Sequence, residues 1–273
     1  MSILYVVGTP IGNLGDISPR ALETLEQVDF IAAEDTRVTL KLLNHFEIKK
    51  PMVSYFEHNK EYRGQIICDR IKAGESCAIV TDAGMPCISD PGELLIKQCE
   101  EYGIKTVVVP GPSAVISALC VSGLATGRFC FEGFLSVNKK SRMEHLDELV
   151  NENRTMIFYE APHKLSNTLT DLYKAFGDRK LTIARELTKL HEEIIRTTTK
   201  DAVEKYGDGS LKGEIVLVLE GKTGTDEEES YTLADAVKMA EKFISDGMRP
   251  TDAAKEAAKI TKIRKNDIYK ELV

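Results

Sequence analysis

The sequence of 273 residues lacks tryptophan, and it lacks the patterns typical of membrane, secreted and metal-binding proteins. No run of about 18 uncharged apolar residues occurs, so we expect no membrane-spanning helix. The N-terminus carries no basic segment ahead of an apolar one, so we expect no signal peptide and a cytoplasmic protein. The six cysteines form no C-x-x-C pair and the five histidines no H-E-x-x-H, which argues against disulfides and against a bound metal.

Basic residues are scarce over most of the chain. The net charge is −7, although residues 249–273 alone carry seven Lys or Arg and four Asp or Glu, a local +3 that leaves −10 for residues 1–248. An acidic body argues against broad, non-specific nucleic-acid binding, whereas the basic C-terminal segment is a candidate for local contacts with phosphates. With 42% hydrophobic residues, the composition excludes disorder and collagen and permits well-packed cores.

Short apolar runs alternate with helical patterns in the first half of the chain. Such uninterrupted runs are typical of strands buried on both faces, and their alternation with helices predicts a mostly parallel α/β sheet. Ser18-Pro19 and Asp90-Pro91 each place a capping residue and a proline at a predicted helix start. The predicted strands are Ile3–Val7, Phe30–Ala33, Met52–Tyr55, Ala78–Thr81 and Thr106–Val109.

The pattern changes in the second half, where strand-like stretches follow one another with only a short helix between them. This change predicts a mixed sheet, so we expect an N-terminal α/β domain over residues 1–125 and a second α/β domain over 126–222. A polar, acidic linker over 221–230 precedes a helical tail over 231–273 that breaks near Thr261. The predicted strands are Thr155–Tyr159, Leu181–Arg185, Glu192–Thr199 and Gly213–Glu220, and the predicted helices are Lys139–Val150 and Lys164–Phe176.

Three loops rich in glycine and proline follow predicted strands, at residues 8–14, 82–92 and 110–114. In an open parallel sheet these strand ends share one edge, where ligands bind. The loops match neither the dinucleotide fingerprint nor a phosphate-binding loop, and they contain no Lys or Arg. They therefore favour a neutral or cationic ligand held by the main chain over a phosphate.

Several polar strings lie near the same predicted edges, at residues 33–37, 56–59, 159–164, 184–193 and 212–214. The string at 33–37 places two carboxylates and a guanidinium at the end of a strand. The structural alternative is that Asp35 caps a helix and Arg37 is solvated. For His163 and His191, a hydrogen-bonded surface position is the favoured interpretation.

Taken in order, nine strings resemble the ribosomal RNA small-subunit methyltransferase I family of the tetrapyrrole methylase superfamily. They are GTPIGNLGDIS, AEDTR, DAGMPCISDPG, VPGPSA, SGL, FEGFL, FYEAPHKL, ARELTKLHEE and KGE, and they span residues 8–214. The resemblance implies two α/β domains with S-adenosylmethionine in the cleft between them, usually in a homodimer. It implies methylation of the ribose 2′-hydroxyl of a cytidine in the decoding region of small-subunit (16S) ribosomal RNA. Met85 and Cys87 depart from the family, which usually has Thr and Gly there.

The resemblance also implies cofactor contacts, most of them through the main chain. They fall on Thr9, Pro10, Ile11, Gly12, Asp82, Ala83, Gly84, Ile88, Ser113, Ala114, Tyr159, Glu160, Leu187, Lys212, Gly213 and Glu214. S-adenosylmethionine carries a sulfonium, an adenine and a ribose but no phosphate, so loops without basic residues suit it.

Methyl transfer to an alcohol needs aligned reactants and a group that accepts the hydroxyl proton. The candidates for that base are Glu34, Asp35, His58 and Glu160, and the sequence does not choose among them. Arg37, Arg185 and Lys189 are candidates for phosphate or ribose contacts, and the tail adds Lys262, Arg264 and Lys265. We expect the target nucleotide to flip into the cleft, with Phe56 or Tyr159 as candidates for stacking on its base.

Two other functions remain open at this point. One is a methyltransferase of the same fold that acts on a tetrapyrrole or a protein side chain, which would not need the string at 33–37 or the helical tail. The other is a non-catalytic ribosome-binding protein, which would not need the full set of cleft loops. A methylation assay on undermethylated small subunits distinguishes them.

Overall fold

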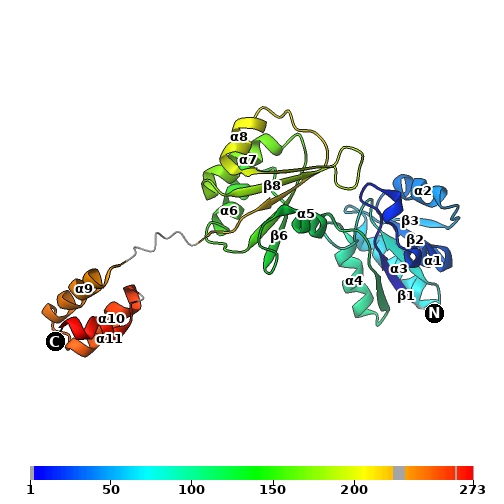
Figure 1. Cartoon of the computed structure of the whole chain (residues 1–273). Helices are drawn as coiled ribbons and strands as arrows, with labels where there is room; N and C mark the ends of the chain where they lie inside the picture. The colour runs from blue at the N-terminus through cyan, green and yellow to red at the C-terminus, as the bar shows by residue number, and fades with distance from the viewer. Residues whose placement is uncertain (1–2, 224–230, 262, 273) are drawn as a thin grey trace. The chain divides into compact units, whose positions relative to one another are not determined.

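The computed structural model describes residues 3–223, 231–261 and 263–272, and the chain divides into two compact units between Gly221 and Lys222 (Figure 1). Unit 1 contains two sheets with helices, and unit 2 is helical over its described residues. The expected α/β class with a C-terminal helical tail is confirmed.

The first sheet of unit 1 consists of five parallel strands in the order β3-β2-β4-β1-β5. Each strand coincides with a predicted range to within one residue, because uninterrupted apolar runs fit a sheet that is covered on both faces. The strands are β1 (Ile3–Val7), β2 (Phe30–Ala33), β3 (Met52–Ser54), β4 (Cys77–Val80) and β5 (Lys105–Val109).

Helices pack on both faces of this sheet. Phe30 faces a core with Ile67 and Leu95, whereas its neighbour Ile31 faces a core with Leu25 and Leu43. Adjacent strand residues thus point to opposite layers. The helices of one layer are α1 (Pro19–Gln27) and α2 (Thr36–His45), and those of the other are α3 (Lys60–Lys72) and α4 (Gly92–Glu101).

The predicted helix starts are confirmed at Ser18 and shifted at Asp90. Ser18 caps α1, and its hydroxyl accepts the Ala21 N–H at 3.1 Å. The helix α4 begins at Gly92 with Pro91 as its N-cap, one residue later than predicted. The Asp90 carboxylate accepts the N–H of Gly92, the first residue of the helix, and it also accepts N–H groups of the loop ahead of it.

The second sheet is mixed, as predicted, in the order β6-β7-β10-β8-β9, with β6 parallel to β7 and the other pairs antiparallel. Three helices cover one face, and α5 (Ala114–Ser122), which follows the first sheet in sequence, covers the other. The elements are β6 (Phe129–Phe134), α6 (Lys139–Glu148), β7 (Thr155–Glu160), α7 (Leu165–Phe176), β8 (Lys180–Arg185), β9 (Glu193–Thr198), α8 (Thr199–Tyr206) and β10 (Ile215–Leu219).

Strand β6 was not predicted from the sequence. Glu132 and Gly133 interrupt its apolar run, and the pairing with β7 shifts register between Phe131 and Gly133. It is also an edge strand whose residues are exposed or half-buried. A bulged edge strand of this kind lacks the alternation on which strand prediction depends.

Unit 2 contains α9 (Leu233–Ser245), α10 (Pro250–Thr261) and α11 (Lys265–Leu272). Thr232 and Asp235 form a capping box at the start of α9, and the helices pack through small side chains such as Ala240, Ala254 and Ala257. Helix α10 ends at Thr261, where the sequence predicts that the helical tail is split. Most of the predicted acidic linker lies outside the described residues. Within the described residues, no helix is long and apolar enough to cross a bilayer, and no cluster of His, Cys, Asp and Glu suits a metal ion.

Candidate active site

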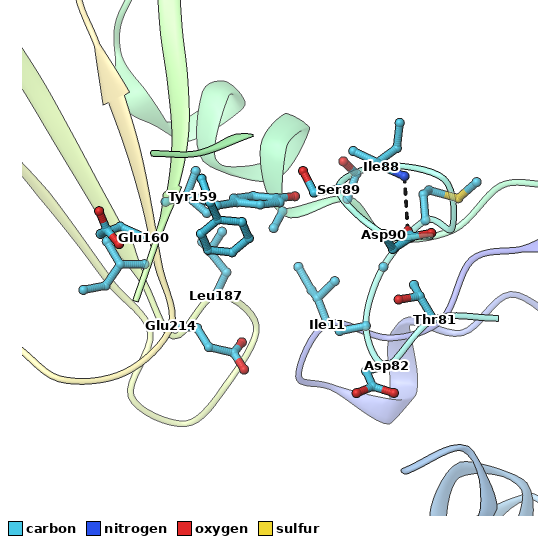
Figure 2. Close-up of a pocket in the computed structure, with 18 of the residues that line it drawn as sticks. Ile11, Thr81, Asp82, Ile88, Ser89, Asp90, Tyr159, Glu160, Leu187 and Glu214 are labelled. Atoms are coloured by element: carbon cyan, nitrogen blue, oxygen red, sulfur yellow. Dashed lines mark hydrogen bonds between the residues drawn. The ribbon is translucent and has the colours of Figure 1, made fainter. Parts of the chain in front are cut away.

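A pocket of about 400 Å³ lies in unit 1 where the carboxyl ends of the first sheet's strands face the second sheet (Figure 2). The first half of the chain contributes loops after β1, β2, β4 and β5, and the second half contributes the ends of β6, β7 and β8 and the start of β10. The lining residues are Ile11, Glu34, Thr81, Asp82, Ala83, Gly84, Met85, Ile88, Ser89, Asp90, Ser113, Ala114, Phe134, Tyr159, Glu160, Ala161, Pro162, Ala184, Leu187, Glu214, Ile215 and Val216.

Main-chain contacts hold the glycine-rich loops of the first sheet together. Thr9 and Gly84 exchange two backbone hydrogen bonds, of 2.9 and 3.1 Å, and the buried Thr9 hydroxyl donates to the Thr81 carbonyl at 3.2 Å. Gly8 and Gly111 approach so closely that a Cβ on Gly8 would lie 2.7 Å from the Gly111 Cα. The loops therefore pack against each other through their main chains, and a side chain at Gly8 or Gly111 would clash with the facing loop.

Met85, which departs from the family pattern, contacts both of these glycine loops through its side chain. The Gly111 N–H donates to the Met85 thioether sulfur at 3.2 Å, and the same sulfur would lie 2.7 Å from a Cβ on Gly8. The Met85 side chain thus supplies an acceptor between two loops and fills the space beside Gly8.

The loop at 87–89 has an unusual backbone. Cys87 (φ 73°) and Ser89 (φ 64°) are both left-handed, and Ile88 between them lines the pocket. The Asp90 carboxylate accepts the N–H groups of Cys87 (2.8 Å), Ile88 (3.2 Å) and Gly92 (2.8 Å), and partial burial raises its pKa. A left-handed backbone favours glycine, which is the residue that the family resemblance leads us to expect at position 87. Burial raises the pKa of the Cys87 thiol to about 12.

Two carboxylates lie side by side at the ends of β2 and β4. The Glu34 carboxylate accepts hydrogen bonds from the Thr81 hydroxyl and, at 3.5 Å, from the Asp82 N–H. The Asp82 carboxylate accepts the Asp35 N–H at 3.2 Å. Partial desolvation raises the pKa of Asp82, and the neighbouring Glu34 carboxylate raises it further. Both side chains line the pocket, and among the described residues neither carboxylate forms an ion pair with a Lys, Arg or His side chain.

Asp35 and Arg37 lie outside the pocket lining. Asp35 caps α2 by accepting the Arg37 N–H at 2.8 Å, and its carboxylate also pairs with the Arg37 guanidinium at 2.6 Å. The hydrogen bonds from Arg37 hold the pKa of Asp35 at about 2. The Arg37 side chain is 87% exposed. His58 is also exposed and lies outside the lining, with its ring at the edge of Phe56.

An aromatic group forms the wall of the pocket on the side of the second sheet. The Tyr159 ring lies edge-on to Phe131 with centroids 4.9 Å apart, and it is tilted against Phe134 at 5.4 Å. Burial raises the pKa of Tyr159. The next residue, Glu160, is almost fully buried, and its two carboxylate oxygens accept the Thr168 hydroxyl and the Ala161 N–H. Figure 2 shows Tyr159 and Glu160 across the pocket from Ile88 and Asp82.

The loop after β8 repeats the left-handed arrangement. Glu186 (φ 51°) and Thr188 (φ 66°) flank Leu187, which lines the pocket. The Glu186 carboxylate accepts the Glu214 N–H at 2.8 Å, which is the main reason that its pKa is lowered. Lys189 pairs with both carboxylates, Glu186 and Glu214, at 3.1 Å. Glycine is required at 213, where φ is 100° and a Cβ would lie 2.6 Å from the Glu186 Cγ.

One glycine joins the two halves of the pocket. A Cβ on Gly12 would lie 2.5 Å from the Lys189 Cγ and 2.9 Å from the Thr188 hydroxyl oxygen. The loop after β1 thus packs directly against the loop after β8. A side chain at Gly12 would push these loops apart, which accounts for its place in the site although it does not line the pocket.

The pocket brings together most of the predicted cofactor residues. Those in its lining are Ile11, Asp82, Ala83, Gly84, Ile88, Ser113, Ala114, Tyr159, Glu160, Leu187 and Glu214, together with the candidate base Glu34. Thr9, Pro10, Gly12, Lys212 and Gly213 lie outside the lining in the supporting loops, and the Lys212 carbonyl accepts the Arg185 guanidinium at 3.0 Å.

The predicted RNA-contacting residues are dispersed. Arg185 pairs with Glu193 at 2.8 Å, and Lys189 pairs with Glu186 and Glu214 in the loop after β8. Arg264 and Lys265 belong to unit 2, and Lys262 lies outside the described residues.

Several lining residues were not predicted. Three of them, Ala184, Ile215 and Val216, belong to strands, where the sequence predicts that an apolar residue lies in the hydrophobic core. Phe134 ends the strand that was missed. Thr81, Ser89 and Asp90 flank predicted positions, and their place in contiguous polar loops was the available signal. Met85, Ala161 and Pro162 complete the unpredicted set.

Comparison with known proteins places this architecture among methyltransferases. Residues 3–203 match the family model of tetrapyrrole (corrin/porphyrin) methylases. Relatives named ribosomal RNA small subunit methyltransferase I include those of Synechocystis sp. (47% identity over 98% of this chain and 96% of the relative) and Bacillus subtilis (44%, 98% and 93%). The relative from Thermotoga maritima is 49% identical, and its whole length corresponds to only 81% of this chain.

Solved structures resemble the fold at low sequence identity. They include cobalt precorrin-4 methyltransferase (TM-score 0.61, 18% identity, 80% of this chain and 95% of that chain). Diphthine synthase is similar to the same extent (TM-score 0.60, 16% identity, 80% and 90%). These likenesses support the fold alone.

Proposed function

The chain belongs to the ribosomal RNA small subunit methyltransferase I family of the tetrapyrrole methylases, and from this premise we propose that it methylates small-subunit (16S) ribosomal RNA with S-adenosylmethionine as donor. We extend the proposal to the ribose 2′-hydroxyl of a cytidine in the decoding region. The nine family strings support this finer assignment, and mapping of the methylated nucleotide tests it.

The observation that carries the proposal is the charge of the pocket. Its lining over the described residues contains no Lys, Arg or His but five carboxylates, from Glu34, Asp82, Asp90, Glu160 and Glu214. A desolvated phosphate would be repelled there, whereas a sulfonium cation is favoured by nearby carboxylates. The volume of about 400 Å³ is within the range of about 300–1,000 Å³ that is typical of small-molecule pockets.

The remaining lining also fits the proposed donor. Ala83, Gly84 and Ala114 leave the backbone accessible for close approach, and Phe134 with Tyr159 offers aromatic surface to an adenine. When bound, the donor supplies an activated methyl group. The protein's part is to hold the reactants in line, since favourable near-attack geometry is worth about 7–11 kcal/mol in model systems.

Among the candidate bases, we assign the proton of the ribose hydroxyl to the pair Glu34 and Asp82. Both line the pocket, and the raised pKa of Asp82 makes it a stronger proton acceptor than an ordinary carboxylate. Asp35, with a pKa of about 2, is a poor acceptor, and both Glu160 oxygens are occupied by structural hydrogen bonds. Glu160 is thus assigned to positioning, and Arg37 to RNA contact because of its exposure.

The test uses labelled S-adenosylmethionine, undermethylated small subunits and mapping of the product. We expect the wild type to label the RNA, and Glu34→Gln and Asp82→Asn to reduce kcat by about 10²–10⁴-fold. Donor affinity measured by calorimetry should fall much less than kcat, because each variant removes only one of the five carboxylates that favour the sulfonium. Label in a porphyrinoid or a protein instead of RNA would favour a different substrate of the same fold. Absence of donor binding would overturn the proposal.

A homodimer in the cytoplasm is also part of the proposal. Helix α5 is mostly apolar, yet its residues Ile116 and Val121 are 47% and 39% exposed, and Val108 on the edge strand β5 is 57% exposed. Exposed apolar side chains of this kind support a contact with a second copy of the chain. Light scattering on the purified protein tests the dimer, which a monomeric mass would contradict.

Unit 2 is proposed as an accessory RNA-binding part. The relative from Thermotoga maritima corresponds over its full length to 81% of this chain, close to the extent of unit 1. Truncation after Gly221 should therefore preserve donor binding and weaken binding to the small subunit. Arg264→Ala with Lys265→Ala in the full chain should weaken subunit binding in the same direction.

A further inference from the structure

Leu190 stands out as an apolar side chain in solvent. It is 93% exposed, and no other large apolar side chain among the described residues is more exposed. It lies in the loop between β8 and β9, which also carries Leu187 in the pocket lining. An isolated exposed leucine is unremarkable on a mobile surface. This one is on a loop that many contacts hold in place.

Hydrogen bonds and ion pairs fix the loop on both sides of Leu190. The Glu192 carboxylate accepts the Thr188 N–H at 2.6 Å, and the Glu192 N–H donates to the Lys189 carbonyl at 3.1 Å. The Lys189 ammonium bridges Glu186 and Glu214. Leu190 is thus presented by a preorganised backbone, so a contact made by its side chain costs little conformational entropy.

The loop also lies at the pocket. Leu190 follows the lining residue Leu187 by three positions, a chain distance of at most about 10 Å. Gly12 from the other half of the pocket packs against Thr188 and Lys189, immediately before Leu190. Leu190 therefore lies on a loop that lines the pocket, within about 10 Å of a lining residue along the chain.

A ribose inside a stacked helix is poorly presented to a pocket unless its nucleotide leaves the stack. The extruded nucleotide leaves a gap, and enzymes that extrude bases must offset the loss of stacking. Apolar side chains inserted between bases perform this role in nucleic-acid-binding proteins. We propose that Leu190 occupies the gap left by the target nucleotide and so stabilises its extruded state. This rests on the proposed function and adds a substrate-positioning residue to it.

The test compares Leu190→Ala, Leu190→Phe and the wild type on undermethylated small subunits. In Leu190→Ala, kcat/KM should fall by about 10- to 100-fold, corresponding to about 1.4–2.8 kcal/mol, because extrusion of the target nucleotide becomes less favourable. Leu190→Phe, which keeps an apolar group, should stay within about threefold of the wild type. Donor affinity by calorimetry and stability in urea should be unchanged in both variants, since the side chain is exposed. Leu40→Ala, on an exposed leucine of α2 outside the pocket lining, is the matched control.

A second measurement reports extrusion itself. Subunits are reconstituted with RNA that carries 2-aminopurine beside the mapped target nucleotide. Binding of the wild type should raise its fluorescence, and binding of Leu190→Ala should not. Equal kcat/KM for Leu190→Ala and the wild type would overturn the proposed role of Leu190. A loss of activity in Leu190→Ala with an undiminished rise in fluorescence would also overturn it. If the wild type labels no subunit RNA, the proposed function is wrong, and the proposed role of Leu190, which rests on it, is wrong as well.

Discussion

The two loops that face each other across the pocket use the same backbone arrangement but different bonds to hold it. In residues 87–89 and again in 186–188, two left-handed residues flank an aliphatic side chain that lines the pocket. Asp90 holds the first loop through three backbone N–H groups. The second loop depends on an ion cluster in which Glu186, Lys189 and Glu214 are partners. Strained backbone beside the pocket is thus held in place by hydrogen bonds to one carboxylate in the first loop and by hydrogen bonds and ion pairs in the second.

Removing the support of the first loop should have the largest effect. Asp90→Ala leaves the N–H groups of Cys87, Ile88 and Gly92 without their acceptor, and unsatisfied groups of this kind cost about 1–3 kcal/mol each when buried. Because the site is only half-buried, we expect a loss of about 3 kcal/mol in the free energy of unfolding in urea, and loss of donor binding in calorimetry.

The control for this prediction is Asp90→Asn, which keeps one carbonyl oxygen as acceptor. It should retain most of the stability. If Asp90→Ala unfolds at the same urea concentration as the wild type, the loop does not depend on this carboxylate.

The second loop can be broken at Gly213. In Gly213→Ala the new methyl group must displace the Glu186 side chain from a position 2.6 Å away, at a backbone φ of 100°. We expect a loss of about 2 kcal/mol in the free energy of unfolding and weaker donor binding. Gly209→Ala is the matched control, because its φ is 75° but no atom lies within 4 Å of the added Cβ. Equal losses in both variants would show that only the backbone angle matters.

Lowering the pH should change the contributions of the two loops to stability in opposite directions. The raised pKa of Asp90 means that its contribution to stability is fully present below the ordinary value of 3.8 and is lost as the pH rises through the raised value. The lowered pKa of Glu186 means the reverse: its contribution is present above 4.5 and is lost as the pH falls through the lowered value.

Urea unfolding of two variants at pH 6 and pH 4 measures this difference. On acidification the destabilisation by Asp90→Asn should grow, and that by Glu186→Gln should shrink. Parallel changes in the two variants would contradict the distinction between the loops.

The smallest effect concerns the strain itself. Cys87→Gly removes the left-handed strain of a non-glycine residue but also a packed thiol, so we expect a net gain of about 0.5 kcal/mol in the free energy of unfolding. A shift of the urea midpoint measures it, and donor affinity should be unchanged. A clear loss of stability would mean that the thiol's packing outweighs the strain.

The sequence predicts best those features that depend on local patterns. The strands of the first sheet are continuous apolar runs, and Ser18 caps a helix by a local hydrogen bond, so both can be read from a few residues. The loops that carry Ile11, Gly84 and Leu187 were found because Gly, Pro and polar residues cluster after strands.

Features that depend on tertiary contact were not predictable in this way. Glu34, Asp35 and Glu160 have the same functional group, and only the structure shows that Asp35 pairs with Arg37, that Glu160 is buried with both oxygens occupied, and that Glu34 faces the pocket. From the sequence alone, Asp90 is predicted to be a helix cap because Pro91 and Gly92 follow it. The turn that it holds depends on the left-handed angles at Cys87 and Ser89, which neither residue type favours.

The contact between Gly8 and Gly111 sets a limit on how this protein can change over generations. Side chains with an exposed part in the pocket, such as Ile88, can vary in size and polarity with the ligand that they meet, because they have open space on one side. At these two positions even one methyl group would have to move the main chain of a neighbouring loop. Genetic drift in the family can therefore alter what the pocket prefers far more easily than it can alter the path of the chain beneath it.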